Sequence, residues 1–200
     1  MSKYAFFVSS TSKHVAAGAI AALALTSLAM TPAFAQDKMK TEMSGEKTVM
    51  VGGAAMFPSR NIVQNAVNSK DHTTLVAAVK AAGLVGTLEG KGPFTVFAPT
   101  NTAFGKLPAG TVDNLVKPEN KATLTKILTY HVVAGKLEAS DLTEGKKLKT
   151  VEGEELTVKR SGDKVMIVDA KGGSSTVTIS NVNQSNGVIH VVDTVLMPAS

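Results

Sequence analysis

Apolar residues repeat at helical spacing in the first half of the chain and alternate with polar residues in the second half. A helix is predicted over residues 72–88, with Asp71 in a capping position before it. Its apolar stripe consists of Leu75, Val76, Val79, Ala82 and Leu88. A second helix is predicted over residues 118–130, because Pro118 suits a first helical position and apolar residues recur on one face.

Short segments with alternating apolar residues predict a sheet. The earliest predicted strand covers residues 94–98. The later ones cover residues 147–151, 155–159, 164–168, 175–182 and 188–195. Turn-forming residues such as Ser161-Gly162-Asp163 separate these segments. Helices that come first and mostly antiparallel strands that follow favour an α+β fold over a doubly wound parallel sheet.

The beginning of the chain has the pattern of a secretory signal peptide, which we predict over residues 1–35. An apolar run over residues 15–30 follows two lysines, and Ala33 and Ala35 form a cleavage site of the Ala-x-Ala type. The run is shorter than the roughly 20 residues of a membrane span. Its length therefore favours cleavage over the alternative of an uncleaved membrane anchor.

The rest of the chain divides into an arm and a domain. Residues 36–55 are polar and lack periodicity, which predicts a flexible N-terminal arm. Residues 56–198 contain the predicted helices and strands without an internal repeat, which predicts one folded domain. The signal peptide predicts that this domain is secreted to the periplasm or to the extracellular medium.

Composition removes several classes of chemistry. The chain has no Cys, which excludes disulfides, zinc–thiolate sites, iron–sulfur clusters and thiol nucleophiles. The formal net charge of +5 comes from 21 Lys and Arg against 16 Asp and Glu, and two of the lysines belong to the leader. Basic residues are scattered and not clustered with aromatic ones, so nucleic acid is not an expected partner.

Sequence motifs for catalysis and cofactor binding are also missing. There is no Gly-x-Gly-x-x-Gly and no phosphate-binding loop, so no cofactor is expected. The histidines beyond the leader, His72, His131 and His190, are not spaced as metal-ligand pairs, so no metal site is expected. No Gly-x-Ser-x-Gly elbow presents a Ser nucleophile. We therefore expect no catalytic residue.

Two of these histidines have a predicted structural role. His131 lies between an amphipathic helix and two valines, so we expect it to be partly buried and hydrogen-bonded at the helix–strand junction. The alternative for His131 is a recognition or acid–base residue. His190 shares one strand face with Val188 and Val192, which also favours a structural role.

Three short segments of the chain, taken in order, have the composition of sequence motifs. The first covers residues 92–104 and includes Thr95, Phe97, Pro99, Thr100, Asn101 and Phe104. The second is Leu128-Thr129-Tyr130-His131-Val132-Val133. The third covers residues 186–198 and includes Asn186, Gly187, His190 and Asp193. We interpret Asn101 as the residue that turns the chain into a helix, and Asn186-Gly187 as a positive-φ turn before the last strand.

Together these segments resemble the fasciclin domain family over about residues 56–198. The resemblance implies an α+β fold in which helices pack around a wedge of mostly antiparallel strands. It also implies a role in adhesion or matrix contact without a shared catalytic reaction. In animal relatives the Tyr-His segment is associated with integrin contact, which maps to Leu128, Tyr130, His131, Val132 and Val133. The acidic-plus-Ile element of those relatives has no counterpart here, so integrin itself is not the expected partner.

Three functions remain open at this point. The leading hypothesis is an exported, non-enzymatic module that contacts a cell-surface or matrix protein or a polysaccharide, without stable membrane insertion after signal cleavage. The second is a periplasmic binder of a small apolar ligand, which a dry pocket of roughly 300 Å³ or more would support. The third is a hydrolase that uses a Ser with His131 or His190, which requires the two side chains to lie within hydrogen-bond reach.

Overall fold

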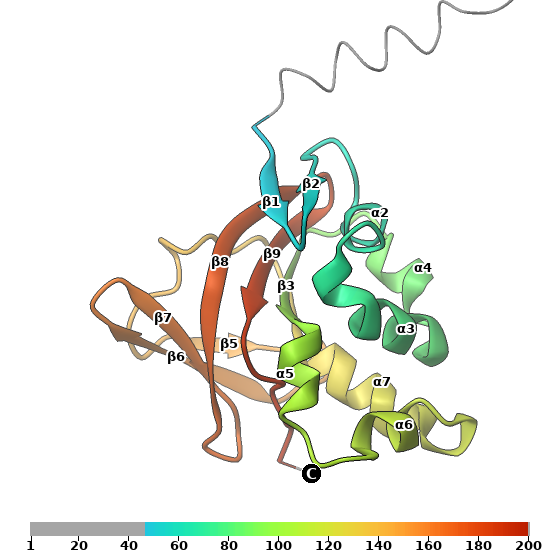
Figure 1. Ribbon diagram of the computed structural model, residues 1–200. Helices are drawn as coiled ribbons and strands as arrows, with labels where there is room; N and C mark the ends of the chain where they lie inside the picture. The colour runs from blue at the N-terminus through green and yellow to red at the C-terminus, as the bar shows by residue number, and fades with distance from the viewer. Residues whose placement is uncertain (1–46, 200) are drawn as a thin grey trace, which may run out of the picture.

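Two apolar strands, β3 (Phe94–Pro99) and β9 (Gly187–Val192), run parallel through the middle of the computed structural model, which describes residues 47–199 (Figure 1). Every residue of β9 is buried. A strand that is covered on both faces reads as a continuous apolar run, so the near-continuous Val and Ile content of β9 follows from its central place.

A seven-stranded sheet is built outward from this pair in the order β4-β3-β9-β8-β7-β6-β5. Apart from the β3–β9 pair, all neighbours in the sheet are antiparallel. The remaining strands are β4 (Val132–Ala134), β5 (Lys147–Lys149), β6 (Glu155–Ser161), β7 (Lys164–Val168) and β8 (Ser174–Gln184). The α+β class with mostly antiparallel strands is thereby confirmed.

The two edges of the sheet approach each other and nearly close it into a barrel. Val133 of β4 forms an isolated antiparallel bridge with Thr150, the residue that follows β5. The Val151 N–H also donates to the Val132 carbonyl over 2.7 Å. These two contacts join β4 to the residues that directly follow β5 and so bring the two edges of the sheet together.

The helices lie together on one side of the central strands (Figure 1). They are α2 (Ile62–Ala66), α3 (Thr73–Ala82), α4 (Val85–Leu88), α5 (Asn101–Gly105), α6 (Thr111–Leu115) and α7 (Lys121–Tyr130), with 3₁₀ turns at η1 (Lys70–His72) and η2 (Pro118–Asn120). The predicted helix over residues 72–88 is therefore two helices. Gly83 separates them with a left-handed backbone at φ 74°, a common way to end a helix.

The folded domain starts earlier than predicted. Residues 36–46 and the predicted signal peptide lie outside the described residues, but residues 47–55 do not form a free arm. They contain β1 (Val49–Val51) and the first part of β2 (Ala54–Met56), which pair as an antiparallel hairpin. Val51 and Met56 are both buried against the helices, which fixes the hairpin to the domain.

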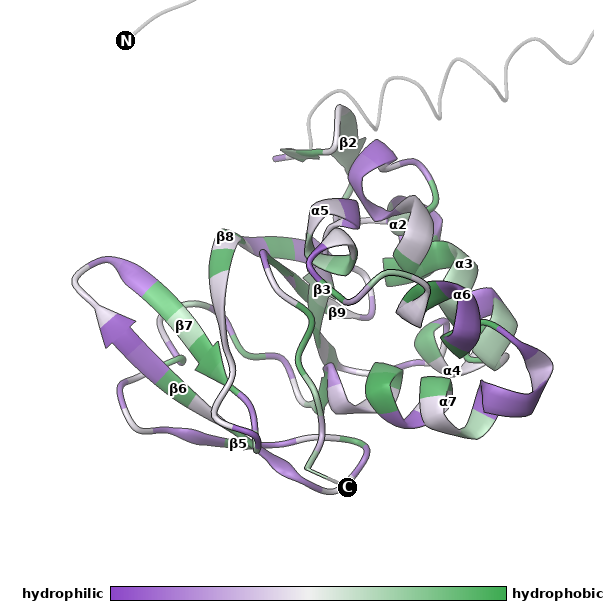
Figure 2. Cartoon of the chain, turned by 60° about the horizontal axis from the view of Figure 1, so that its bottom comes forward, coloured by the Kyte–Doolittle hydropathy of each residue, from purple (hydrophilic) through white to green (hydrophobic). Residues whose placement is uncertain are grey.

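Apolar side chains form two cores, one on each side of the central strands. The helix-side core lies between the helices and the sheet and includes Ile62, Leu75, Leu88, Val96, Leu128 and Ile189. The barrel-side core lies inside the curved sheet and includes Phe97, Tyr130, Leu156, Val158, Ile167 and Val192. Figure 2 shows apolar residues along β3 between them and hydrophilic residues at the outer end of β6. Within residues 47–199, no helix combines the length and the apolar character needed to cross a bilayer.

Candidate functional site

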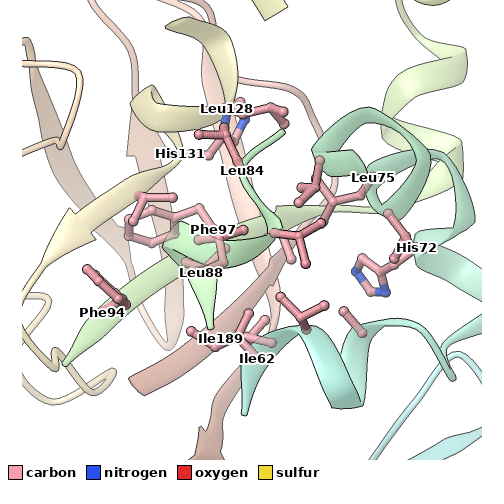
Figure 3. Close-up of a pocket in the computed structure, with 18 of the residues that line it drawn as sticks. Ile62, His72, Leu75, Leu84, Leu88, Phe94, Phe97, Leu128, His131 and Ile189 are labelled. Carbon is pink, nitrogen blue, oxygen red and sulfur yellow. The ribbon is translucent and has the colours of Figure 1, made fainter. Parts of the chain in front are cut away.

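A pocket of about 80 Å³ lies in the helix-side core, between the short helices and the central strands (Figure 3). Its wall is almost entirely apolar and includes Ile62, Leu75, Leu84, Leu88, Phe94 and Ile189. The pocket is well below the roughly 300 Å³ of a site for a drug-sized ligand. It is about half the size of a cavity of roughly 150 Å³ that stays dry and binds benzene. In this form it admits a small apolar group.

His72 brings a polar atom to this apolar wall. Its ring lies at the end of the pocket opposite Phe94 (Figure 3), and only 3% of the residue is exposed. Nδ1 lies 2.8 Å from Ser69 Oγ, whereas Nε2 is buried without a hydrogen bond. Burial lowers the pKa of His72, an effect that the nearby Ala98 backbone and Asp71 partly offset. The Ala98 backbone is thus close to the ring, but it does not form a hydrogen bond of ordinary geometry with Nε2.

The Ser69–His72 contact bears directly on the hydrolase hypothesis. That hypothesis named His131 or His190, and the Ser–His pair observed instead uses His72. In a Ser–His–acid triad, Ser contacts one ring nitrogen and a carboxylate orients the other. Here Ser69 contacts Nδ1, and Nε2 has no carboxylate partner. The pair also has little access to solvent, because 2% of Ser69 is exposed. The geometry does not support nucleophilic catalysis.

His131, in contrast, uses both ring nitrogens inside the fold. Nδ1 lies 2.8 Å from the Ile127 carbonyl, and Nε2 accepts a hydrogen bond from the Leu196 N–H over 3.0 Å. Because Nε2 accepts, the proton of the neutral ring must be on Nδ1. Burial lowers the pKa of His131 to about 4, although the Ile127 carbonyl and Asp169 oppose the shift. The ring therefore joins helix α7 to the C-terminal segment as a neutral group.

His190 is held in a similar way on the central strand. Nε2 lies 2.8 Å from the Leu137 carbonyl, and Nδ1 accepts a longer hydrogen bond of 3.4 Å from the Asn181 N–H. Its ring stacks on Phe97 with centroids 5.7 Å apart. Burial lowers the pKa of His190, and the Leu137 carbonyl and Glu138 partly counter this. These contacts are those of a packed structural residue.

The five residues assigned to partner contact are all buried. Leu128, Tyr130, His131, Val132 and Val133 have exposed fractions of 7% or less. The Tyr130 hydroxyl accepts a hydrogen bond from the Ala170 N–H over 2.9 Å, so even its polar tip is used internally. In the folded domain these side chains join α7 to the sheet. A contact role for them stays a prediction that would require the segment to open.

The Asn186-Gly187 segment does not form the predicted positive-φ turn, since neither residue has a positive φ. Gly187 is required for a different reason: a Cβ atom there would overlap the Phe94 carbonyl oxygen. The Asn186 side chain donates to the Leu88 and Gly90 carbonyls over 2.7 and 2.9 Å. It also accepts from the Ile62 N–H over 3.1 Å. The segment thus ties helices α2 and α4 to the sheet beside the pocket.

Asn101 differs from its predicted role in a similar way. Thr100, not Asn101, caps helix α5, because its hydroxyl accepts from the Ala103 N–H. The Asn101 side chain reaches sideways, accepting from the Thr74 N–H over 3.0 Å and donating to the Lys70 carbonyl over 2.8 Å. Asn101 therefore fixes the start of α3, and with it the position of the neighbouring His72.

The remaining motif residues also make internal contacts. The Thr95 hydroxyl donates to the Gly135 carbonyl over 2.6 Å and accepts from the Leu137 N–H. Asp193 accepts from the Thr176 N–H over 2.8 Å. Burial alone would raise the pKa of Asp193, but hydrogen bonds from Thr176 and its neighbours hold it below its usual range. Phe97, Pro99 and Phe104 are buried.

The pocket and His72 are the features that the sequence did not identify as a site. The spacing of Ser69 and His72, three residues apart at a helix start, is a local signal for their contact. The apolar wall gave no signal, because residues that line a pocket look the same in a sequence as residues that fill a core. Within the described range, no three His, Asp or Glu side chains are grouped to hold a metal ion.

Comparisons with known proteins agree with this architecture. The model of the Fasciclin domain family matches residues 70–198. Protein sll1483 of Synechocystis sp. is 47% identical over 92% of this chain and 97% of its own length. Cell surface glycolipoprotein MPB83 of Mycobacterium bovis is 39% identical over 74% of this chain and 64% of its own length. The FAS1 domain pair of the insect cell adhesion molecule Fasciclin I has the same fold, with a TM-score of 0.63 and 16% identity over 76% of this chain and 58% of that one. The chain therefore belongs to the fasciclin domain family.

Proposed function

We propose that this chain is an exported, non-enzymatic fasciclin module that works by contact with a cell-surface or matrix partner. Family membership carries the proposal. Among the similar proteins, one is named a cell surface glycolipoprotein and another belongs to a cell adhesion molecule. The predicted signal peptide would deliver this chain to the same side of the membrane as such a partner.

The use of the motif residues inside the domain supports this function. Four motif residues use their polar side-chain atoms to hydrogen-bond backbone groups within the domain: His131, His190, Asn101 and Asn186. They build a rigid body, which leaves partner contact to the exterior. Large apolar side chains that stand out on this exterior are Met50, Val67 and Val151, with exposed fractions of 59, 48 and 46%.

Attachment assays with the host test this proposal. Deletion of the gene should reduce attachment, and the natural chain supplied in trans should restore it. The variants Met50→Ser, Val67→Ser and Val151→Ser test the exterior, with Lys91→Ser as a control for an exposed position. Unchanged attachment in the deletion strain would contradict the proposal.

A second candidate function, the binding of a small apolar ligand, is favoured by the helix-side pocket. The wall joins residues from α2, α3, α4, β3 and β9 around one apolar space. The pocket volume of about 80 Å³ is smaller than the volume expected above for a whole ligand. A cavity of roughly 150 Å³ holds benzene, so by proportion this pocket fits an apolar group of about three non-hydrogen atoms.

Titration with propane tests this second candidate. Propane should shift the methyl NMR signals of wall residues such as Leu75, Leu88 and Ile189. It should leave the methyl signals of Leu156 and Ile167 in the barrel-side core unchanged. The variant Ala66→Leu adds volume to the wall and should abolish the shifts. Equal shifts in both cores would show non-specific uptake.

A further inference from the structure

We propose that an open groove at the seam of the barrel binds an extended acidic segment of a partner protein, which adds to strand β5 and places carboxylates on Lys147 and Lys149. The inference rests on the proposed contact function and adds the surface and the chemistry of the partner. Three observations carry it: the groove between β4 and β5, the direction of the β5 backbone, and the lysines around an apolar floor.

The groove lies where the two edges of the sheet separate. The edges meet at Thr150 and Val151, which contact β4. The residues before this contact, 146–149, face residues 133, 134 and 137 across an open groove of about 410 Å³. This volume is within the range of roughly 300–1,000 Å³ that is typical of binding sites.

The backbone of β5 presents a strand edge to this groove. In an antiparallel pair, successive residues direct their backbone groups alternately to one side and to the other. The Lys146 carbonyl accepts from the Val158 N–H of β6 over 2.8 Å, and the Thr150 N–H donates over 3.0 Å to the residue before β6. Lys147 and Lys149 therefore direct their backbone groups away from β6 and toward the groove. An extended chain can pair with such an edge as an additional strand.

The charges around the groove favour an acidic partner. Lys147 and Lys149 are exposed, and the ammonium group of the half-buried Lys146 donates to the Asp141 backbone carbonyl, which carries no charge. Lys147 lies 3.3 Å from the Glu155 carboxylate, whereas Lys149 forms no ion pair with any residue that the structure describes. None of the described residues that line the groove is acidic. A segment with carboxylates would complement this excess of positive charge.

The floor of the groove decides the pattern of the segment. It is apolar and includes Val133, Leu137 and Leu148. Because side chains alternate along a strand, the residues opposite Lys147 and Lys149 would lie on the outer face beside the lysines, and the residue between them would face the floor. The expected pattern is acidic-apolar-acidic. An acidic polysaccharide could reach the lysines, but it has no peptide backbone to pair with β5.

The experiment adds the capped peptide Thr-Glu-Val-Glu-Thr to the ¹⁵N-labelled chain. It should shift the amide signals of residues 146–150 and slow hydrogen exchange of the Lys147 amide. A peptide with Ser in place of Val should bind about 5-fold more weakly, because it loses the apolar contact with the floor. A peptide with Lys in place of both Glu should not bind.

A variant of the groove lysines tests the charges. The triple change Lys146→Ser, Lys147→Ser and Lys149→Ser should weaken binding about 10-fold, as expected for the loss of two exposed ion pairs. A matched control removes three exposed lysines that do not line the groove: Lys91→Ser, Lys117→Ser and Lys171→Ser. It has the same net charge and should change binding less than about 2-fold.

The outcomes separate this inference from the function on which it rests. Absence of shifts at residues 146–150 with about 10 mM peptide would overturn the groove as a site. Shifts without slower exchange at Lys147 would overturn strand addition. A uronate oligosaccharide that binds the groove more tightly than the peptide would overturn the choice of a protein partner. Full attachment of the deletion strain with the triple groove variant would overturn the groove and keep the proposed function, whereas unchanged attachment after deletion alone would overturn that function.

Discussion

The barrel-side core and the helix-side core share strands β3 and β9, yet they differ in how completely their groups are satisfied. In the barrel-side core, Tyr130 and the stacked pair of Phe97 and His190 are fully buried, and their polar atoms have partners. The helix-side core contains a pocket, and His72 on its wall keeps one nitrogen unpaired. In natural domains, loose packing and buried polar atoms without hydrogen bonds occur mainly at functional sites. The difference therefore favours the helix-side core as the location of a functional site.

The architecture explains why the gap lies on that side. The barrel-side core is enclosed by a nearly closed sheet, in which neighbouring strands fix each other by hydrogen bonds. The helix-side core is covered by pieces as short as α2 and α4, with five and four residues. Helices of this length are not stable alone and depend on tertiary contacts such as those of Asn186. A cover of this kind can adjust to a ligand more easily than a sheet can.

The largest expected difference between the two cores is in the response to side-chain truncation. Leu156→Ala, on β6, should lower the free energy of unfolding by about 4 kcal/mol, because a rigid sheet cannot collapse around the cavity. Leu88→Ala, on α4 beside the pocket, should lower it by about 2 kcal/mol, because Leu88 already lacks neighbours on one side. Urea unfolding of both variants measures the two losses. Equal losses would remove the proposed contrast in packing.

The next effect is a loss of stability in acid, which arises from His131 at the junction of the two cores. The folded-state pKa of about 4 lies below the ordinary value of 6.5, so the unfolded chain binds the proton more readily. Stability is therefore complete above about pH 6.5 and falls as the pH drops toward 4, by on the order of 3 kcal/mol. Burial lowers the pKa values of His72 and His190 too, and their contributions have the same sign.

Urea unfolding between pH 7.5 and pH 4 measures this loss, and an NMR titration assigns it to single rings. The His131 signals should stay those of the neutral ring until the pH approaches 4. The variant His131→Asn cannot titrate and should flatten the profile. Titration of His131 near its ordinary pKa in the folded chain would contradict the burial and the two hydrogen bonds described above.

The sequence predicted the sheet better than it predicted the site. Alternation located β7 at its observed bounds, since a half-buried strand imposes a period of two on its side chains. Of β4 only the junction at His131 was expected, without strand bounds, and the hairpin β1–β2 was missed because its two short strands lie in a segment that showed no periodicity. The apolar stripe predicted over residues 72–88 is present, but it is divided between two helices because Gly83 ends α3.

Motif residues were located by sequence, but the roles assigned to two of them were wrong for a physical reason. Asn101 and Gly187 were interpreted through local rules for caps and turns. Their contacts are long-range instead: Asn101 reaches the start of α3, and Gly187 makes room for the backbone of β3. A single sequence carries no direct record of such approaches. The pocket could not be predicted for the same reason, because it is a property of how helices α2, α3 and α4 meet the sheet.

A smaller effect concerns single hydrogen bonds in the two regions. Tyr130→Phe removes the hydroxyl that accepts from the Ala170 N–H in the barrel-side core, and should lower the free energy of unfolding by about 1.5 kcal/mol. Thr129→Val removes a partly exposed hydroxyl that bonds only to its own helix, and should change it by less than about 0.5 kcal/mol. Thermal unfolding compares the two. A larger loss for Thr129→Val would mean that the helix side depends on its polar contacts as strongly as the barrel side does.

The smallest expected effect is also the most direct comparison of the two interiors, because it adds one methylene group to each. Val96 lines the pocket and Val158 lies fully buried in the barrel-side core, and both are on strands. Val96→Ile should fill part of the gap and raise the free energy of unfolding by about 0.5 kcal/mol. Val158→Ile should lower it by about 1 kcal/mol, because a close-packed core has no room for the added group. Urea unfolding measures both changes in the free energy of unfolding. Changes of opposite sign would establish that the pocket has room for an added methylene group. A loss of stability in both variants would mean that the helix-side core is packed as closely as the barrel-side core.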